Sequence, residues 1–375
     1  MKIALFGGSF DPVHNEHVRY VQAAKAALGL DRVYIIPSHI APHKAFGAAA
    51  SGADRLQMCN LAFRNLPYAE MSDYELRAAG TSYSYLTCRA FAERFPNDEL
   101  YFLVGADMLE DFFTWKNPDD ILAHATLVAC GREGENPAEF REKFFRRFGK
   151  EFISISFAGD AAASHKLRVD LAFRKPTPDL DRAVRRYIDE NRLYGHPAIA
   201  PALALEKPQR REHSYRVALM AVARARSVGV AEGKALLASA LHDCAKYVPL
   251  TSPLLEDFTP PENVPPPVMH QYTGAYLARH AFGIEDEEVL DAIRYHTSGR
   301  AGMTTLGKLV FLADMLESGR SFDGVERLRE IFWKDLDGCF YEALREQTEY
   351  LAASGSRVYP LTREAYEYEK ARQNR

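Results

Sequence analysis

Two histidines that follow a glycine-rich turn are the first residues in the chain whose types and spacing suggest chemistry. The apolar run of residues 2–6 leads directly into the string GGSFDPVHNEH, residues 7–17. Glycine lets the backbone approach a ligand closely, and the free N–H groups at a helix N-terminus favour phosphate. His14 and His17 lie three residues apart, so both imidazoles can face one side of the turn that opens the next helix. The combined pattern predicts an anion site, although a glycine turn alone is as often an ordinary turn and a single histidine is more often structural.

A second set of residues, in the other half of the chain, combines imidazole with carboxylate. Its members are spread over several segments: His213, His242, Asp243, His270, His296 and Asp314. Imidazole and carboxylate together suit iron, manganese, zinc and similar ions. Each of these histidines alone would more often be a hydrogen-bonded structural residue. As a set they predict a metal centre.

The elements that would position the first histidine pair alternate between strands and helices. Apolar runs of strand length occupy residues 2–6, 32–36, 100–104, 125–130 and 151–156, and amphipathic helical stretches separate them up to about residue 195. This alternation predicts a parallel sheet with helical crossovers, an α/β Rossmann-like domain. Ligands of such sheets bind beyond the carboxyl ends of the strands, so the loops after residues 6, 36 and 104 are the candidate positions.

Helical patterns replace this alternation in the second half of the chain. The string GHPAIAP, residues 195–201, is interpreted as a linker because glycine and two prolines interrupt helix and strand alike. Helices are predicted at about residues 215–227, 231–245, 287–294 and 306–316, and the five prolines of residues 259–267 predict an extended loop. We therefore expect a first domain at 1–195, a linker at 196–201 and an all-α second domain at 202–375.

Composition restricts the expected partners and compartment. The formal net charge of -4 over 375 residues gives no basic field, so nucleic acid and acidic membrane surfaces are not expected partners. No eighteen apolar residues run together, and the apolar run at the start is too short for a signal peptide. The five cysteines are widely separated and form no C-x-x-C pair, which is typical of reduced cytosolic proteins. We expect a cytoplasmic protein.

The string GGSFDPVHNEH resembles the signature of the nucleotidyltransferase superfamily, whose two histidines bind the phosphates of ATP. Four further stretches narrow the resemblance to the nicotinate-nucleotide adenylyltransferases and extend it over nearly all of residues 1–195: IPSHIAPHK, TSYSYL, VGADMLEDFFTWK and RAVRRYIDENRLYG. Two positions depart from the family pattern. Glu16 stands where glycine is usual, and in AASHKLR His165 replaces a small hydroxyl residue.

This resemblance implies transfer of AMP from ATP to nicotinate mononucleotide, with Mg²⁺ accompanying ATP. It places His14, His17, Lys44 and Arg168 at the reacting phosphates, Gly8, Ser9, Phe10, Gly105, Asp107 and Ser164 at ATP, and Ser84 and Trp115 at the pyridine nucleotide. Catalysis would then consist of positioning and charge neutralisation, without a covalent enzyme intermediate. A helix cap is the structural alternative for Asp107, and core packing is the alternative for Trp115.

The helical half resembles the HD-domain phosphohydrolases, in particular the bacterial symmetrical diadenosine tetraphosphate hydrolases. The strings that carry this resemblance lie within about residues 202–365: HSYRVALMAVARA, LLASALHDCAKY, AIRYHTSG and LVFLADMLESGR. It implies a dinuclear iron centre, with manganese or another transition metal as the alternative. One metal would be held by His213, His242, Asp243 and Asp314, and the other by His270 and His296, with Asp243 shared.

The same resemblance implies cleavage of diadenosine tetraphosphate to two ADP. Lys246 and Arg320 would meet its phosphate oxygens, and a solvated surface charge is the alternative for each. The substrates of both halves stay open at this point. The first half could use another phosphate acceptor, and the helical half could hydrolyse other nucleotides or act as a nucleotide sensor without turnover.

Overall fold

The computed structural model of the chain describes residues 1–39, 49–78, 80–105, 108–132, 138–157 and 163–373. These residues form two compact units. The first comprises Met1–Leu167 and Pro176–Tyr194, and the second comprises Arg168–Lys175 and Gly195–Arg375. A predicted domain boundary thus lies beside the division at residues 194 and 195, but a short segment from the first half of the sequence belongs to the second unit.

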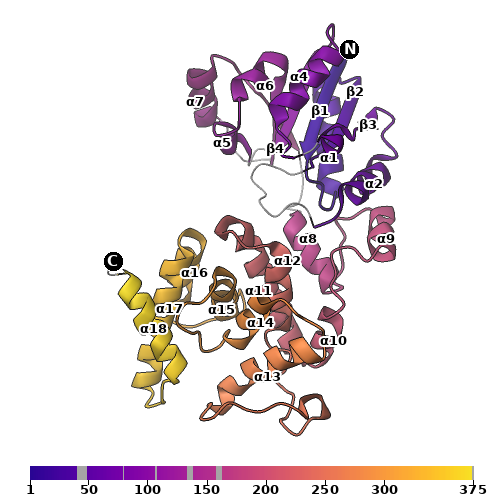
Figure 1. Cartoon of the computed structure of the whole chain (residues 1–375). Helices are drawn as coiled ribbons and strands as arrows, with labels where there is room; N and C mark the ends of the chain where they lie inside the picture. The colour runs from indigo at the N-terminus through magenta and orange to yellow at the C-terminus, as the bar shows by residue number, and fades with distance from the viewer. Residues whose placement is uncertain (40–48, 79, 106–107, 133–137, 158–162, 374–375) are drawn as a thin grey trace. The chain divides into compact units, whose positions relative to one another are not determined.

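Within the described residues, a six-stranded parallel sheet forms the centre of the first unit (Figure 1). Its strands are β1 (Lys2–Gly8), β2 (Arg32–Pro37), β3 (Ala69–Met71), β4 (Glu99–Gly105), β5 (Thr126–Arg132) and β6 (Ile153–Phe157). They are ordered 3-2-1-4-5-6, and every neighbouring pair is parallel. The predicted Rossmann-like fold class and the five predicted strands are confirmed.

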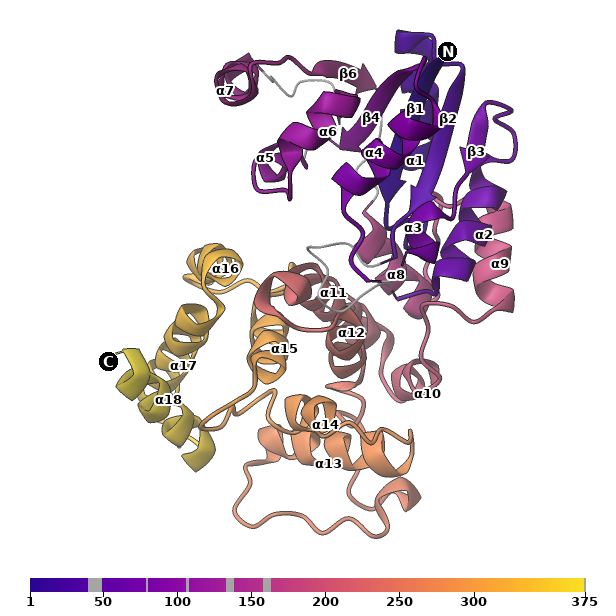
Figure 2. The ribbon, with the colours of Figure 1, turned by 45° about the horizontal axis from the view of Figure 1, so that its top comes forward.

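Both faces of the sheet are covered because the strand side chains alternate between two apolar layers. Ile3 and Leu5 belong to a core cluster with Phe91 of α4 (Ser84–Arg94). Phe6 points to the other face, where its ring lies 5.0 Å from that of Tyr20 of α1 (Asn15–Leu28). Successive side chains of a strand face opposite sides, so this alternation requires helices on both faces (Figure 2).

The remaining helices of the first unit are short. They are α2 (Gly52–Phe63), α3 (Tyr74–Arg77), α5 (Met108–Phe112), α6 (Pro118–His124), α7 (Ala138–Phe148) and α9 (Arg182–Glu190). Helix α8 (Ser164–Ala172) is divided between the two units. Helix α1 begins at Asn15 as predicted, and it ends before Gly29, whose φ of 66° is the left-handed conformation that favours glycine.

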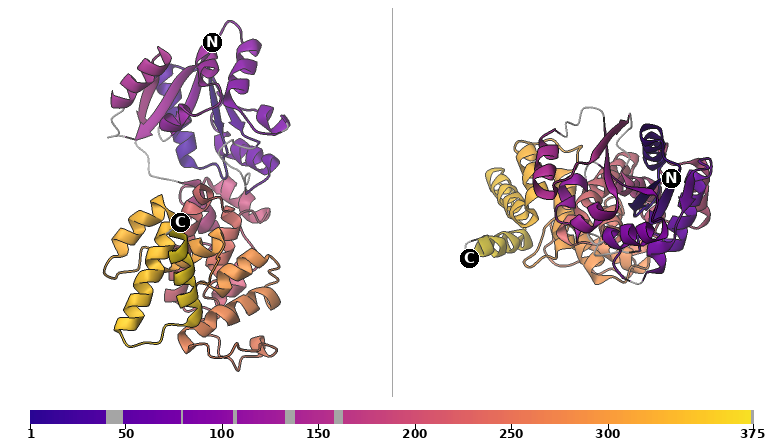
Figure 3. Two further views of the ribbon diagram at one scale, coloured as in Figure 1. Left: turned by 60° about the vertical axis from the view of Figure 1, so that its left-hand side comes forward. Right: turned by 90° about the horizontal axis from the view of Figure 1, so that it is seen from above.

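The second unit is all-helical in the part of the chain that the structure describes, as predicted. Its helices are α10 (Ile199–Ala204), α11 (Pro208–Ala225), α12 (Glu232–Leu241), α13 (Pro266–His280), α14 (Glu287–Arg294), α15 (Thr305–Leu316), α16 (Val325–Lys334), α17 (Leu336–Ala353) and α18 (Pro360–Gln373), with 3-10 turns at Arg226–Val228 and Pro253–Leu255. The last two helices, α17 and α18, pack side by side (Figure 3). None of the described helices is long and apolar enough to cross a bilayer.

The segment expected to be a linker differs from that expectation. Helix α10 begins at Ile199, inside residues 196–201, and Ile199 and Ala202 are buried in the core of the second unit. Pro201 lies in the first turn, where its missing N–H removes no intrahelical hydrogen bond. The prolines therefore mark the beginning of a helix and not an extended connection.

Candidate metal centre and candidate phosphate loop

The candidate phosphate loop follows the carboxyl end of β1. A Cβ atom on Gly8 would lie 3.0 to 3.3 Å from the ring of Phe10, so this close approach favours glycine. Phe10 itself has a positive φ of 47°. The guanidinium of the buried Arg55 donates to the Ser9 carbonyl at 2.8 Å and thereby holds the turn. Sequence reasoning missed Arg55, because its partner lies 46 residues away along the chain.

His14 and His17 lie together at the N-terminus of α1. The backbone N–H of His14 donates to Nδ1 of His17 at 3.2 Å, and the two ring centroids are 3.8 Å apart. Burial lowers the pKa of the His14 imidazole to about 4, so this ring is neutral at pH 7. The structure therefore brings the two predicted imidazoles side by side, and their contact with phosphate stays a prediction.

The other residues predicted at ATP are only partly placed. Lys44 and Asp107 lie outside the described residues. Gly105 ends β4, which neighbours β1, so it lies at the same edge of the sheet as the phosphate loop. The Ser164 hydroxyl donates to the Pro12 carbonyl in that loop at 3.3 Å.

The residues predicted at the pyridine nucleotide lie on two elements of the first unit. Ser84 is the first residue of α4. Trp115 is partly buried, with its ring centroid 5.4 Å from that of Phe112 and 6.2 Å from that of Phe102. Core packing and a ligand contact of Trp115 are both compatible with this position, because one face of an indole can pack on the core while the other meets a ligand.

Arg168 belongs to the second unit, whereas the histidine pair belongs to the first. It is buried and forms an ion pair with Glu232, which also pairs with Arg226. A phosphate contact of Arg168 stays a prediction, and a phosphate would have to compete with the partly buried carboxylate of Glu232 for the guanidinium.

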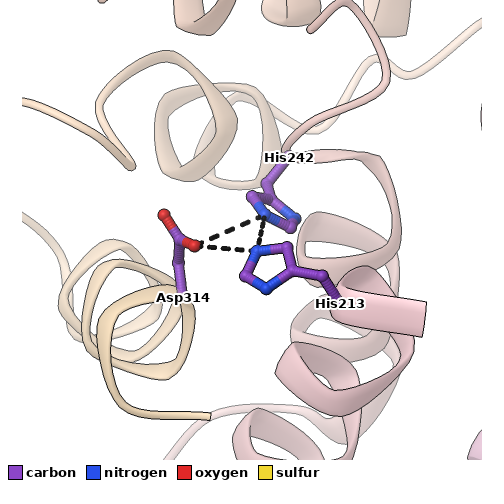
Figure 4. Close-up of side chains that lie close together, drawn as sticks. All are labelled: His213, His242 and Asp314. Atoms are coloured by element: carbon purple, nitrogen blue, oxygen red, sulfur yellow. Dashed lines mark hydrogen bonds and ion pairs between the residues drawn. The ribbon is translucent and has the colours of Figure 1, made fainter. Parts of the chain in front are cut away.

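Imidazoles and carboxylates converge in the second unit, as Figure 4 shows for three of them. Nε2 of His213, on α11, lies 2.9 Å from Oδ1 of Asp314, on α15, and 3.4 Å from Nε2 of His242, which follows α12. Their possible ligand atoms all lie within 4.8 Å of one another, and the same holds for His242, Asp243 and His296. All six residues predicted to hold metal are thus brought to one place, since His270 contacts both Asp243 and His296.

Asp243 lies between the two groups of histidines. Its Oδ2 atom is 3.5 Å from Nε2 of His242 and 3.9 Å from Nε2 of His213. Its Oδ1 atom is 3.1 Å from Nε2 of His270 and 3.5 Å from Nε2 of His296. One oxygen faces each pair of imidazoles, which is the arrangement that a shared carboxylate needs.

Hydrogen bonds to the outer nitrogens determine which ring atoms are available for a ligand. Nδ1 of His242 and Nδ1 of His296 lie 2.7 and 2.8 Å from backbone carbonyls, which only accept, so both Nδ1 atoms donate. Nδ1 of His213 is held in the same way by the buried carboxylate of Glu317 at 3.1 Å. In the neutral rings the inward Nε2 atoms are acceptors facing one another. Acceptors this close call for a cation between them, so these residues fit a metal ion.

Burial and neighbouring charge shift the pKa values of four of the six candidate ligands in the direction that favours metal binding. Burial lowers the pKa of His242 to about 3 and also lowers that of His270. Burial alone would raise the pKa of Asp243 and Asp314, but at low pH the protonated imidazoles around them outweigh burial and hold both pKa values well below the usual range. Neutral imidazole and ionised carboxylate are the forms that act as ligands.

Cationic side chains border the centre. Nζ of Lys246 lies 3.0 Å from Nε2 of His270, and Nη2 of Arg320 donates to Oδ1 of Asp314 at 2.6 Å, so both predicted cations are at the site. Arg210, which sequence reasoning missed, lies 2.8 Å from Oδ2 of Asp243. Its position three residues before His213 on the same helix was the available signal.

Comparison with known proteins finds a family for each half of the chain and a relative that contains both halves. Residues 5–177 match the cytidylyltransferase-like family model, and residues 210–319 match the HD domain model. A protein of Mycoplasma genitalium, described as a probable nicotinate-nucleotide adenylyltransferase/Ap4A hydrolase, is 30% identical over 85% of this chain and 88% of its own length. The chain belongs to this family of two-domain enzymes, a nucleotidyltransferase followed by an HD hydrolase.

The two domains of this enzyme family also have separate relatives. A protein of Bacillus pumilus, described as a probable nicotinate-nucleotide adenylyltransferase, is 34% identical over 52% of this chain and 98% of its own length. A structure from Clostridium acetobutylicum, described as a predicted HD superfamily hydrolase involved in NAD metabolism, is 30% identical, with a TM-score of 0.44, and covers 47% of this chain and 96% of its own. The HD match includes all six candidate metal ligands.

Proposed function

We propose that the nucleotidyltransferase domain transfers AMP from ATP to nicotinate mononucleotide, giving deamido-NAD and pyrophosphate, and that the HD domain cleaves diadenosine tetraphosphate to two ADP. The names of the relatives support both substrate assignments. The observation that carries the hydrolytic half is the convergence of four imidazole Nε2 atoms on Asp243 and Asp314.

In the adenylyl transfer, a phosphate oxygen of nicotinate mononucleotide attacks the α-phosphorus of ATP as the bond to the leaving pyrophosphate breaks. Mg²⁺ arrives with ATP. His14 and His17 would donate to the phosphates, and a neighbouring phosphate would raise the pKa of His14 toward its charged form. Lys44 and Arg168 keep their predicted role as further phosphate contacts, and Ser84 and Trp115 keep theirs at the pyridine nucleotide.

For the hydrolysis we propose a dinuclear iron centre, with manganese or another transition metal as the alternative. Such ions lower the pKa of water and polarise phosphoryl oxygens, which is the chemistry that the hydrolysis of a phosphoanhydride needs. His213, His242, Asp243 and Asp314 would hold one ion, and His270 and His296 the other, with Asp243 shared. Lys246 and Arg320 would orient the phosphate chain by charge-assisted hydrogen bonds.

An acceptor assay tests the proposed transferase. The intact protein is given ATP and one of three acceptors, nicotinate mononucleotide, nicotinamide mononucleotide or phosphopantetheine, and pyrophosphate release is measured. We expect the fastest release with nicotinate mononucleotide. Release with phosphopantetheine alone would contradict the proposal and would favour a different member of the nucleotidyltransferase superfamily.

Separation of the products tests the proposed hydrolase. We expect ADP alone from diadenosine tetraphosphate, because symmetrical cleavage breaks the central anhydride. AMP with ATP would contradict the symmetrical reaction, and faster turnover of another nucleotide would replace the proposed substrate. Tight nucleotide binding with no product in the metal-loaded protein would instead support a sensor.

A further inference from the structure

A cavity of about 280 Å³ lies against the metal centre of the HD domain. Two of the candidate ligands, His296 and Asp314, form part of its wall. The volume is just below the range of about 300–1,000 Å³ that is usual for small-molecule sites. A nucleotide whose phosphates lie at the metal centre could therefore place one nucleoside here, but not a whole dinucleotide.

The composition of the cavity wall suits a flat heterocycle joined to an anion. Phe311, Met315 and Phe322 supply the apolar part of the wall, and Phe322 remains partly exposed. Aromatic rings and the polarisable thioether of methionine both pack well against a planar base. Arg320 lines the same cavity and contacts Asp314, so its charge lies between the cavity and the candidate metal centre.

Gln347 of α17 also lines this cavity, and its side chain carries an unused acceptor. Its Nε2 atom donates to the backbone carbonyl of Thr297 at 3.4 Å, and this contact fixes the orientation of the amide because a carbonyl only accepts. Its Oε1 atom is enclosed and has no hydrogen-bond partner in the described structure. An enclosed, unpaired acceptor is costly in a folded protein, so a rotation of the Gln347 side chain that brings Oε1 to a ligand donor in the cavity is favourable.

We propose that this cavity is the base subsite of the hydrolase and that Oε1 of Gln347 accepts a hydrogen bond from the exocyclic amino group of adenine. The inference rests on the proposed hydrolytic function and adds a specificity-determining residue to it. A base without this amino group would leave the acceptor unpaired, and sites with a dedicated hydrogen-bonding group discriminate strongly against ligands that lack the partner.

The test compares diadenosine tetraphosphate with the analogue in which both adenines are replaced by unsubstituted purine. With the intact wild-type protein, we expect kcat/KM to be at least about tenfold higher for the adenine compound. In Gln347→Met this preference should disappear through a higher KM for the adenine compound, while kcat and metal content stay unchanged. Glu349→Gln, an exposed change on the same helix, is the matched control and should keep the wild-type preference.

The outcomes separate this inference from the function on which it rests. Equal rates for the two compounds in the wild type, or an unchanged preference in Gln347→Met, would overturn the assignment of Gln347. If the wild type hydrolyses neither compound, the proposed hydrolase is wrong, and calorimetric binding of ADP and purine riboside 5′-diphosphate then decides the subsite alone. The subsite is supported if the wild type binds the purine diphosphate more weakly than ADP and Gln347→Met binds the two equally. Equal binding of the two ligands by the wild type would reject it.

Discussion

Nδ1 of His213 is held by the carboxylate of Glu317, whereas the Nδ1 atoms of His242 and His296 are held by backbone carbonyls. Glu317 is almost fully buried, and its carboxylate accepts from His213, from Arg216 and from the backbone N–H of Gly319 at 2.6 Å. The fixed carboxylate therefore sets both the tautomer and the direction of the His213 ring. Partners of this kind strengthen the ligand as well as orienting it.

Glu317→Gln should weaken metal binding while leaving adenylyl transfer unchanged. The amide of glutamine can still accept from the His213 ring. The substitution removes the negative charge that makes the imidazole a stronger ligand, so we expect a loss of about 10- to 100-fold in metal affinity. Competition with a chelator measures this loss directly. Arg216→Gln, which removes a neighbour of Glu317 but not its contact with His213, is the control, and equal affinities in all three proteins would contradict the assigned role.

His14→Ala should lower the rate of the transferase. One charge-assisted hydrogen bond contributes about 1.5–3 kcal/mol, so its loss in the transition state corresponds to roughly 10- to 100-fold in kcat/KM. His124→Ala is a suitable control because His124 is a partly exposed histidine that pairs with Asp120. If both variants keep wild-type pyrophosphate release, the histidine pair is structural.

Sequence strings identified the residues of the two sites better than the residues that hold them. His213, His242, Asp243 and Asp314 stand in recognisable strings, and the structure brings them together. Gln347 stands in no such string, because its significance depends on a contact with a residue 50 positions away. Contacts of this kind depend on how helices pack, which periodicity along one helix does not reveal.

At the scale of elements, hydrophobic periodicity along the sequence missed the end of one helix and one short strand. A helix was predicted through residue 245, but α12 ends at Leu241. The ring of His242 donates to the carbonyl of Ser239, which in a continued helix would accept from the backbone N–H of Asp243. The short strand β3 was missed because its sequence, AEM, lacks the β-branched and aromatic residues of the other strands.

Helix α18 is joined to α15 by a buried ion pair that should be sensitive to the loss of one partner. Nζ of Lys308 lies 2.9 Å from Oε1 of Glu369, and both side chains are almost fully buried. Lys308→Met would leave the buried Glu369 carboxylate with only the half-exposed Arg372 as a partner, so we expect a loss of up to about 3–5 kcal/mol in the free energy of unfolding. Chemical denaturation measures this loss. The double variant with Glu369→Leu should recover most of it, and equal destabilisation of both variants would contradict the explanation.

Glu206, between α10 and α11, should make stability depend on pH. Burial raises the pKa of its carboxyl from 4.5 to about 8, and Ser214 contacts both of its oxygens. Between these two pH values the unfolded chain has lost a proton that the folded chain retains, so stability falls as pH rises through this window. Glu206→Gln removes this dependence and should therefore stabilise the protein more at pH 8 than at pH 5.

Thermal unfolding of wild type and Glu206→Gln at both pH values checks this prediction. At pH 8 the free energy of unfolding of the two proteins should differ by an amount on the order of a few kcal/mol, because each pKa unit corresponds to about 1.4 kcal/mol. A melting temperature that changes equally with pH in the two proteins would show that Glu206 ionises normally in the folded state.

At the scale of the whole molecule, the chain combines two units with separate cores, and the histidine pair belongs to the first unit while the six candidate metal ligands belong to the second. Both proposed reactions use adenine nucleotides, which motivates the hypothesis of a functional link between them. The rates of the intact chain and of the separately produced halves would test this hypothesis. Equal rates would indicate that the fusion only tethers two independent enzymes.

The most direct test of the proposed metal centre is one sample of intact protein, wild type or Asp243→Ala, assayed for metal content and for the products of both reactions. The wild type should contain a dinuclear complement of metal, release ADP from diadenosine tetraphosphate and form deamido-NAD from ATP and nicotinate mononucleotide. Asp243→Ala should lose the metal and the release of ADP but keep the formation of deamido-NAD, since none of the six metal ligands is among the residues predicted at the substrates of the transferase. Unchanged release of ADP by Asp243→Ala would contradict the metal centre on which the proposed hydrolase depends.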